Sequence, residues 1–231
     1  MDSRYFSIIM NDDFDDFVKF IKRNHYNSYR FPSDISNCPP ILKDNPPLLS
    51  TAAYFGSLQC LNHLLENGAD IKNTDTQNRT VAHFAVAGAH VFVIRILCDY
   101  GVDFNGTLHL ASGMGDICVL KYLINELRLD PSTKDSFSST LLHSAAMGGD
   151  TEIVKYLISL NRIDVNSRDN NGNTPLHLAS LHGNLNIVNE FLDASGIEIM
   201  LENINGVLLK LIKPLFILLQ KKGILTWYNR Y

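Results

Sequence analysis

The stretch Asn173-Thr174-Pro175-Leu176-His177-Leu178-Ala179 decides the fold, because weaker copies of it recur upstream at a nearly constant interval. The alanine that ends each copy measures that interval. Ala52 and Ala85 are 33 residues apart, and 34 residues separate Ala111 from Ala145 and Ala145 from Ala179. The step from Ala85 to Ala111 is shorter, at 26 residues. Self-similarity at a period of roughly 20–50 residues is typical of proteins built from stacked repeats.

Each copy predicts a pair of short helices. A threonine such as Thr174 can cap a helix by accepting from a backbone N–H, and Pro175 suits a first helical turn, where its missing N–H would have no partner. In most copies a glycine four residues after the alanine can end that helix in a left-handed conformation, and a second apolar pattern at helical spacing follows. An Asp/Asn-rich turn such as 169–172 then suits a tight hairpin. We expect helix pairs that begin near residues 48, 81, 107, 141 and 175.

The repeated unit resembles the ankyrin repeat, which has a period of about 33 residues and the signature Thr-Pro-Leu-His-x-Ala. The resemblance implies an all-α solenoid of stacked helix-turn-helix units with short β-hairpin turns. The asparagine-rich units are similar to those of ankyrin proteins from some unicellular eukaryotes. Five repeats are expected, over residues 46–78, 79–105, 106–138, 139–172 and 173–206. Residues 1–45 predict degenerate N-terminal cap helices and a proline-rich loop, and residues 207–231 a degenerate C-terminal cap or tail.

Two departures from the family pattern lead to expectations of their own. The 26-residue step leaves Asp103 running almost directly into Gly106, so we expect a hairpin to be missing there. Just before the fourth repeat, Ser138 stands where the hairpin glycine belongs. Because serine adopts a left-handed conformation less readily than glycine or asparagine, we expect this turn to be distorted.

Composition narrows the classes of function. The 231 residues include 20 Lys+Arg and 24 Asp+Glu, a net charge of −4, so the chain lacks the basic excess that nucleic-acid binding requires. The four cysteines form no Cys-x-x-Cys pair and the N-terminus has no secretory pattern, which predicts buried thiols in an intracellular, cytoplasmic protein. No nucleophile elbow or phosphate-binding loop occurs. We therefore expect neither an enzyme nor a cofactor.

Four histidines occupy the same motif position in successive copies: His83, His109, His143 and His177. Packed helices lie roughly 8–10 Å apart, so these side chains cannot share one metal ion at bond lengths near 2 Å. The resemblance implies instead that each imidazole hydrogen-bonds backbone between units. On that basis we expect no metal site, and we expect His177→Ala to lower the free energy of unfolding by roughly 1–3 kcal/mol.

The resemblance also implies a function, a non-enzymatic scaffold or adaptor that binds a protein or peptide partner on the concave surface. Family contacts fall beside the hairpin turn and two or three residues past the motif alanine. Carried onto this sequence, those positions are Tyr54, Phe55, Gln77, Arg79, Met114, Phe137, Met147, Asn170, Asn171, Asn173, Leu181 and His182. Several are aromatic or Met, which are enriched at protein interfaces. For Tyr54 and Phe55 an alternative is that they pack on the proline-rich loop over residues 26–47.

The C-terminal segment leaves a second function open, that of a peripheral membrane adaptor. Only 13 residues run from Val207 to Leu219, with Lys210, Lys213 and Pro214 among them, whereas spanning a bilayer needs about 20 apolar residues. The tail beyond Glu202 carries five basic residues and no acidic one, which suits an interfacial helix near anionic lipid. A buried cap helix, or a repeat disrupted by a reading-frame change, are the other interpretations of this segment.

Overall fold

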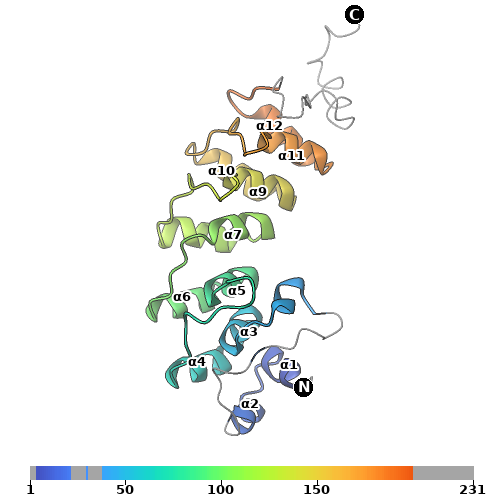
Figure 1. Ribbon diagram of the computed structural model, residues 1–231. Helices are drawn as coiled ribbons and strands as arrows, with labels where there is room; N and C mark the ends of the chain where they lie inside the picture. The colour runs from blue at the N-terminus through green and yellow to red at the C-terminus, as the bar shows by residue number, and fades with distance from the viewer. Residues whose placement is uncertain (1–3, 22–29, 31–37, 200–231) are drawn as a thin grey trace, which may run out of the picture. The chain divides into compact units, whose positions relative to one another are not determined.

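The computed structural model describes residues 4–21, 30 and 38–199, and Figure 1 traces the chain. The described part is built from helices and turns, with an isolated β-bridge between Arg30 and Pro47. The chain divides into two compact units, Met1–Thr107 and Leu108–Tyr231. The end of the fifth predicted repeat, residues 200–206, and the predicted C-terminal cap or tail, residues 207–231, lie outside the described residues.

The described residues of the N-terminal unit form three successive helix pairs and a short 3-10 helix. Its elements are α1 (Arg4–Met10), α2 (Phe14–Ile21), η2 (Pro40–Asp44), α3 (Leu48–Phe55), α4 (Leu58–Glu66), α5 (Val81–Ala87) and α6 (Val91–Asp99). Helix α3 packs against α5, while α1 packs on α3 and α2 on α4. The pair at the N-terminus therefore continues the packing of the repeats (Figure 1).

The C-terminal unit contains a second set of helix pairs. Its described elements are α7 (Leu108–Met114), α8 (Ile117–Lys121) with a π-helical continuation η3 (Tyr122–Glu126), α9 (Leu141–Gly148), α10 (Thr151–Ser159), α11 (Pro175–Leu181) and α12 (Leu185–Asp193). Helix α9 packs between α7 and α11, and α10 packs on α12 (Figure 1). The first helices of the repeats begin at Leu48, Val81, Leu108, Leu141 and Pro175. These starts lie within one residue of the expected ones, so the prediction of an all-α fold of helix pairs is confirmed.

Small residues on the first helices allow close packing. The motif alanines Ala52, Ala85, Ala145 and Ala179 are completely buried. Three residues after two of these alanines, at Gly88 and Gly148, glycine allows even closer packing. A Cβ on Gly88 would lie 2.0 Å from the carbonyl oxygen of Tyr54, and one on Gly148 would lie 2.4 Å from that of Gly113. Both distances are far below van der Waals contact, so the backbones of neighbouring first helices touch at these glycines.

The N-terminal helix pair is attached to the first repeat by capping. The Asp12 carboxylate accepts hydrogen bonds from the backbone N–H groups of Gln59 and Cys60, both at 3.1 Å, in the first turn of α4. The Ser57 hydroxyl, at the N-terminus of the same helix, donates to the carbonyl of Ile9. A carboxylate at a helix N-terminus satisfies N–H groups that lack intrahelical partners and complements the helix dipole. These bonds hold the α1–α2 pair on α4.

Three turns between helix pairs share one geometry. In each, an aspartate (Asp75, Asp135 or Asp169) accepts at Oδ1 from the N–H groups two and four residues later, at 2.8–2.9 Å. A backbone hydrogen bond of 3.0–3.1 Å closes each hairpin from the aspartate N–H to the carbonyl four residues on. Ser138 has a φ of 60°, close to the 59° of Asn78. The expected distortion at Ser138 is therefore wrong, because the bonds of Asp135 hold the turn.

The short step between α6 and α7 does lack such a hairpin, as expected. Asn105 N–H donates to Asp103 Oδ1 at 2.8 Å, and Thr107 N–H donates to the Phe104 carbonyl at 3.2 Å. The motif of this repeat also differs at its first position. Gly106, and not a threonine, stands three residues before His109. The side-chain cap that precedes the other motif histidines is therefore absent from this repeat.

Candidate interaction surfaces

Three of the four motif histidines use Nδ1 within their own repeat, and His109 and His143 use Nε2 to join the next repeat. Nδ1 of His143 accepts from the Thr140 N–H at 3.1 Å, and the equivalent bonds to His83 and His177 are 3.2 Å. A backbone N–H only donates, so Nδ1 carries no proton and the neutral ring is protonated at Nε2. Nε2 of His143 donates to the carbonyl of Asn173, which lies in the next repeat, at 2.9 Å. His109 makes the same bond to the Ser139 carbonyl at 2.9 Å.

Burial favours the neutral form of His83 and His143. It lowers the pKa of His143 below the usual value for histidine, since the charged ring would lose solvation. The pKa of His83 is also lowered, first by burial and then by the positive charge of Arg79. Within residues 4–21, 30 and 38–199, no three His, Cys, Asp or Glu side chains are placed to hold one metal ion.

The C-terminal unit exposes large apolar side chains at the predicted contact positions. Met114, Met147 and Leu181 lie at the C-terminal ends of α7, α9 and α11 and are 51%, 53% and 72% exposed. Phe137, at the tip of the turn before α9, is 67% exposed. We call these four residues the apolar surface. Exposed single hydrophobic residues are common, but the recurrence of three of them, two or three residues after the motif alanine on successive packed helices, is not explained by the core.

A groove lies between two of these helices. It measures about 300 Å³ and is lined by α7 and α9 residues, namely His109, Leu110, Gly113, Met114, Ser144, Met147 and Gly148. The glycines bring the backbones together at its floor, because a side chain on Gly148 would collide with Gly113. The two methionines are unbranched and adaptable, so they can fit apolar partners of different shapes.

The predicted polar contacts of this unit lie on the last hairpin turn and beside α11. Asn170, Asn171 and His182 are exposed. Asn170 also links consecutive turns, because its N–H donates to the Phe137 carbonyl at 2.9 Å. Asn173 is half-buried: its side chain donates to Asp169 Oδ2 at 3.1 Å and its carbonyl accepts from His143. Asn173 thus has a structural role as well as a predicted contact position.

In the N-terminal unit the equivalent apolar positions are covered by the chain itself. Tyr54 and Phe55, whose rings meet edge to face at 5.1 Å, pack with Ile41 against Cys38, Leu42 and Phe84. Leu42 is completely buried. The alternative interpretation of Tyr54 and Phe55, packing on the proline-rich loop, therefore describes their position in this structure.

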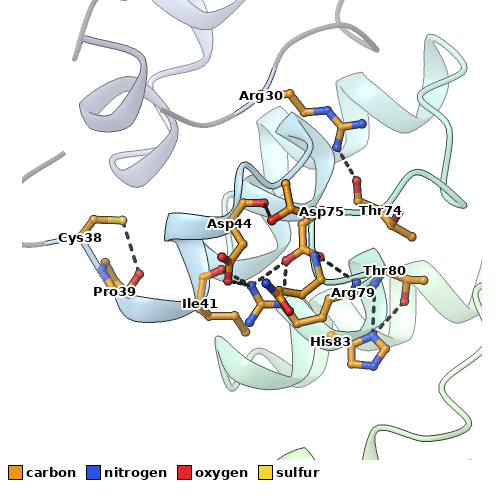
Figure 2. A network of polar contacts seen from close by, with 12 residues as sticks. Arg30, Cys38, Pro39, Ile41, Asp44, Thr74, Asp75, Arg79, Thr80 and His83 are labelled. Atoms are coloured by element: carbon orange, nitrogen blue, oxygen red, sulfur yellow. Dashed lines mark hydrogen bonds and ion pairs between the residues drawn. The ribbon is translucent and has the colours of Figure 1, made fainter. Parts of the chain in front are cut away.

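Arg79 hydrogen-bonds to the same segment, at Ile41 and Asp44 (Figure 2). Its guanidinium donates to Asp44 Oδ2 at 2.7 Å, to the Ile41 carbonyl at 2.9 Å and to Asp75 Oδ2 at 2.6 Å. It also lies 5.4 Å from the centre of the Phe84 ring. Gln77, the other predicted contact on this turn, is exposed.

The sequence prediction did not single out Asp44 or Leu42 as partners of this surface. A signal was present, since Asn45 lies seven residues before Ala52, just as Gly172 lies seven before Ala179. Asn45 adopts the left-handed conformation, with a φ of 53°, and the Thr76 N–H donates to the Asp44 carbonyl at 3.0 Å. This bond joins consecutive turns in the same way as the bond from the Asn170 N–H to the Phe137 carbonyl. Asp44 thus occupies the turn-tip position of the first repeat.

The cysteines are free thiols with different exposures. Cys38 and Cys60 are buried, and burial raises the pKa of the Cys60 thiol well above its usual range, so this thiol is unreactive. Cys98 is half-buried and Cys118 is exposed, so the prediction of buried thiols is wrong for Cys118.

No helix in the described part of the chain has the length and hydropathy needed to cross a membrane.

Comparison with known proteins agrees with the helix-pair architecture. Residues 8–107, 49–135 and 108–203 each match the family model described as "Ankyrin repeats (3 copies)". An L-asparaginase from Dirofilaria immitis is 37% identical over 60 residues. That stretch is 26% of this chain, and it spans only 10% of the length of the asparaginase.

Proposed function

Because the chain belongs to the ankyrin-repeat family, we propose that it is a non-enzymatic scaffold or adaptor that binds a protein or peptide on its apolar surface. Ankyrin repeats are generally protein–protein interaction modules. The finer assignment to Met114, Phe137, Met147 and Leu181 rests on the exposure of these side chains. Aromatic and methionine side chains are enriched at protein interfaces, where they supply contact area.

The packing of the helices supports tight recognition. Within each unit, histidine bonds or glycine contacts fix neighbouring first helices against each other, so the positions of the contact side chains are set before a partner arrives. Binding to such a surface orders little additional backbone and loses less entropy than binding to a flexible loop. The groove beside Gly113 and Gly148 admits a partner side chain of apolar character.

Catalysis has less support. The family is typically non-enzymatic. The similarity to the asparaginase covers a tenth of that enzyme, so it gives this chain no catalytic assignment. The free thiols are compatible with a reducing, intracellular and cytoplasmic location, which this proposal includes.

Affinity capture with matched variants tests the proposal. The double variant Met147→Lys/Leu181→Lys adds two charges to the apolar surface, and Leu185→Lys adds one to α12 at a side chain that is 44% exposed. We expect the double variant to lose at least tenfold of the partner retained by the parent chain and Leu185→Lys to retain it. Circular dichroism checks that both variants are folded. Equal retention by the parent and the folded double variant would remove the apolar surface from the proposal.

The alternative function, a peripheral membrane adaptor, depends on residues 207–231, which lie outside the described residues. Co-sedimentation of the full chain with vesicles of neutral and of anionic lipid separates the two functions. A membrane adaptor sediments with anionic vesicles, whereas a chain that binds only protein stays in the supernatant.

A further inference from the structure

The segment Cys38–Asp44, here called the latch, lies on the N-terminal unit where the family contacts its partners. Its Leu42 side chain is buried among Phe84, Tyr54 and Phe55, and its Asp44 carboxylate is bound by Arg79. Three of the four contact positions predicted in this unit are therefore engaged by the chain itself. At the equivalent places in the C-terminal unit, Met147 and Leu181 are exposed.

The surface beneath the latch does not depend on the latch for its polar geometry. Asp75, whose side chain is fully buried, bonds the Arg79 guanidinium at 2.6 Å, and it also accepts from the Arg79 backbone N–H at 2.8 Å. Removal of the latch would thus leave Arg79 paired with Asp75. The guanidinium N–H groups that now bind Asp44 and Ile41 could then bind another carboxylate and another carbonyl. The guanidinium would remain over the Phe84 ring.

Besides the bonds of Arg79, the latch is held by hydrogen bonds from the N–H and hydroxyl of Thr76 to its Asp44 carbonyl, at 3.0 and 3.1 Å. It is a single 3-10 stretch, Pro40–Asp44, with the Leu42 N–H donating to the Pro39 carbonyl at 2.9 Å. Such stretches have poorer hydrogen-bond geometry than α-helices. The ion pair between Arg79 and Asp44 is accessible to solvent, because these side chains are 24% and 33% exposed. The apolar attachment is the burial of Leu42 and Cys38, and a partner peptide with a similar side chain and backbone carbonyl can replace both the burial and the Thr76 bonds.

We propose that the surface formed by Tyr54, Phe55, Arg79 and Phe84 is a second peptide-binding surface, occupied in the free protein by the latch. Its partner is a peptide with the chemistry of the latch: two adjacent aliphatic side chains, as in Ile41 and Leu42, followed two residues after the second by a carboxylate, as in Asp44. This inference rests on the proposed function, since it assumes that the repeats bind peptides. It adds the chemistry of the partner, and it predicts weaker binding to the latched protein than to a protein whose latch is displaced, because the latch must leave before a partner can bind.

A labelled peptide tests the inference directly. The probe is a fluorescent peptide with the sequence of residues 39–45, and the control peptide has alanine in place of its leucine and aspartate. Binding is measured by fluorescence anisotropy to the full-length parent chain and to the variant Leu42→Ala/Asp44→Ala, in which the latch is weakened. We expect the probe to bind the weakened variant at least tenfold more tightly than the parent, and the control peptide to bind neither. Adding Arg79→Ala to that variant should weaken probe binding at least fivefold.

A probe that binds the folded variant no better than the parent would overturn the inference and make the latch a permanent part of the core. If Leu42→Ala/Asp44→Ala does not fold by circular dichroism, Asp44→Asn decides in its place, because it keeps the buried leucine. We then expect Asp44→Asn to bind the probe about threefold more tightly than the parent does. Equal affinity of the two proteins for the probe would overturn the inference. The capture experiment on Met147 and Leu181 is independent of these variants, so failure of the latch and failure of the proposed function are distinguished.

Discussion

The buried ring of His143 makes a quantitative prediction for the variant His143→Ala. The ring is 1% exposed, and its loss leaves the Thr140 N–H without its partner and removes one of the hydrogen bonds that the Asn173 carbonyl accepts, while that from the Asp169 N–H remains. A buried polar group left unpaired costs about 1–3 kcal/mol, and loss of one hydrogen bond from a carbonyl that keeps another costs about 1 kcal/mol. Together these losses lower the free energy of unfolding by about 2–4 kcal/mol. His109→Ala loses only the bond to the Ser139 carbonyl, from a half-buried ring, so about 1 kcal/mol is expected.

Urea unfolding followed by far-UV circular dichroism measures the difference. With a denaturant slope of roughly 2–3 kcal/mol per molar, His143→Ala should lower the unfolding midpoint by roughly 1 M, and His109→Ala by less than half as much. His182→Ala is the matched control, because the His182 side chain is exposed, and its midpoint should match that of the parent. If the midpoint of His143→Ala stays within about 0.2 M of the parent, the bonds of this ring do not stabilise the repeats.

Three further predictions concern pH, capping and close packing. Burial holds the pKa of His143 below that of the unfolded chain, near 6.5, so its contribution to stability is complete above that pH and declines as the pH falls toward the folded pKa. Between pH 7 and 5.5 the parent should therefore lose more stability than His143→Ala, and equal losses would contradict this. Asp12→Ala should cost about 1 kcal/mol by thermal denaturation, because two N–H groups of α4 lose their cap, whereas the exposed Asp99→Ala should cost nothing measurable. Gly148→Ala should destabilise by about 1–3 kcal/mol through its clash with Gly113, while Gly113→Ala, whose nearest atom lies at 3.7 Å, should be neutral or stabilising. Equal melting temperatures for these two glycine variants would refute the close contact.

The helix pairs could be predicted from the sequence because their signals are local. Threonine caps and apolar spacing fix where each first helix begins, as at Leu141 and Pro175. The error at Ser138 came from judging one residue by its intrinsic preference. The Asp135 carboxylate three residues earlier makes two hydrogen bonds across the turn, and these offset the cost of the left-handed conformation.

The covering of the N-terminal unit was harder to predict, because it depends on contacts between distant residues. The spacing of Asn45 from Ala52 places Asp44 at a turn tip, but nothing in the local sequence says that Leu42 is buried against Phe84. The sequence left two interpretations of Tyr54 open. The fold places that side chain against the proline-rich segment, whereas Leu181 has no such segment before it and is exposed.

Site-specific photo-crosslinking tests the apolar surface most directly. A photoreactive phenylalanine analogue is placed at Leu181 in one variant and at Leu185 in another, and each full-length variant is irradiated with the partner recovered by affinity capture. We predict that the analogue at position 181 forms a covalent adduct with that partner and that the analogue at position 185, on the second helix, does not. Adducts formed at position 185 but not at position 181 would contradict the assignment of the binding surface.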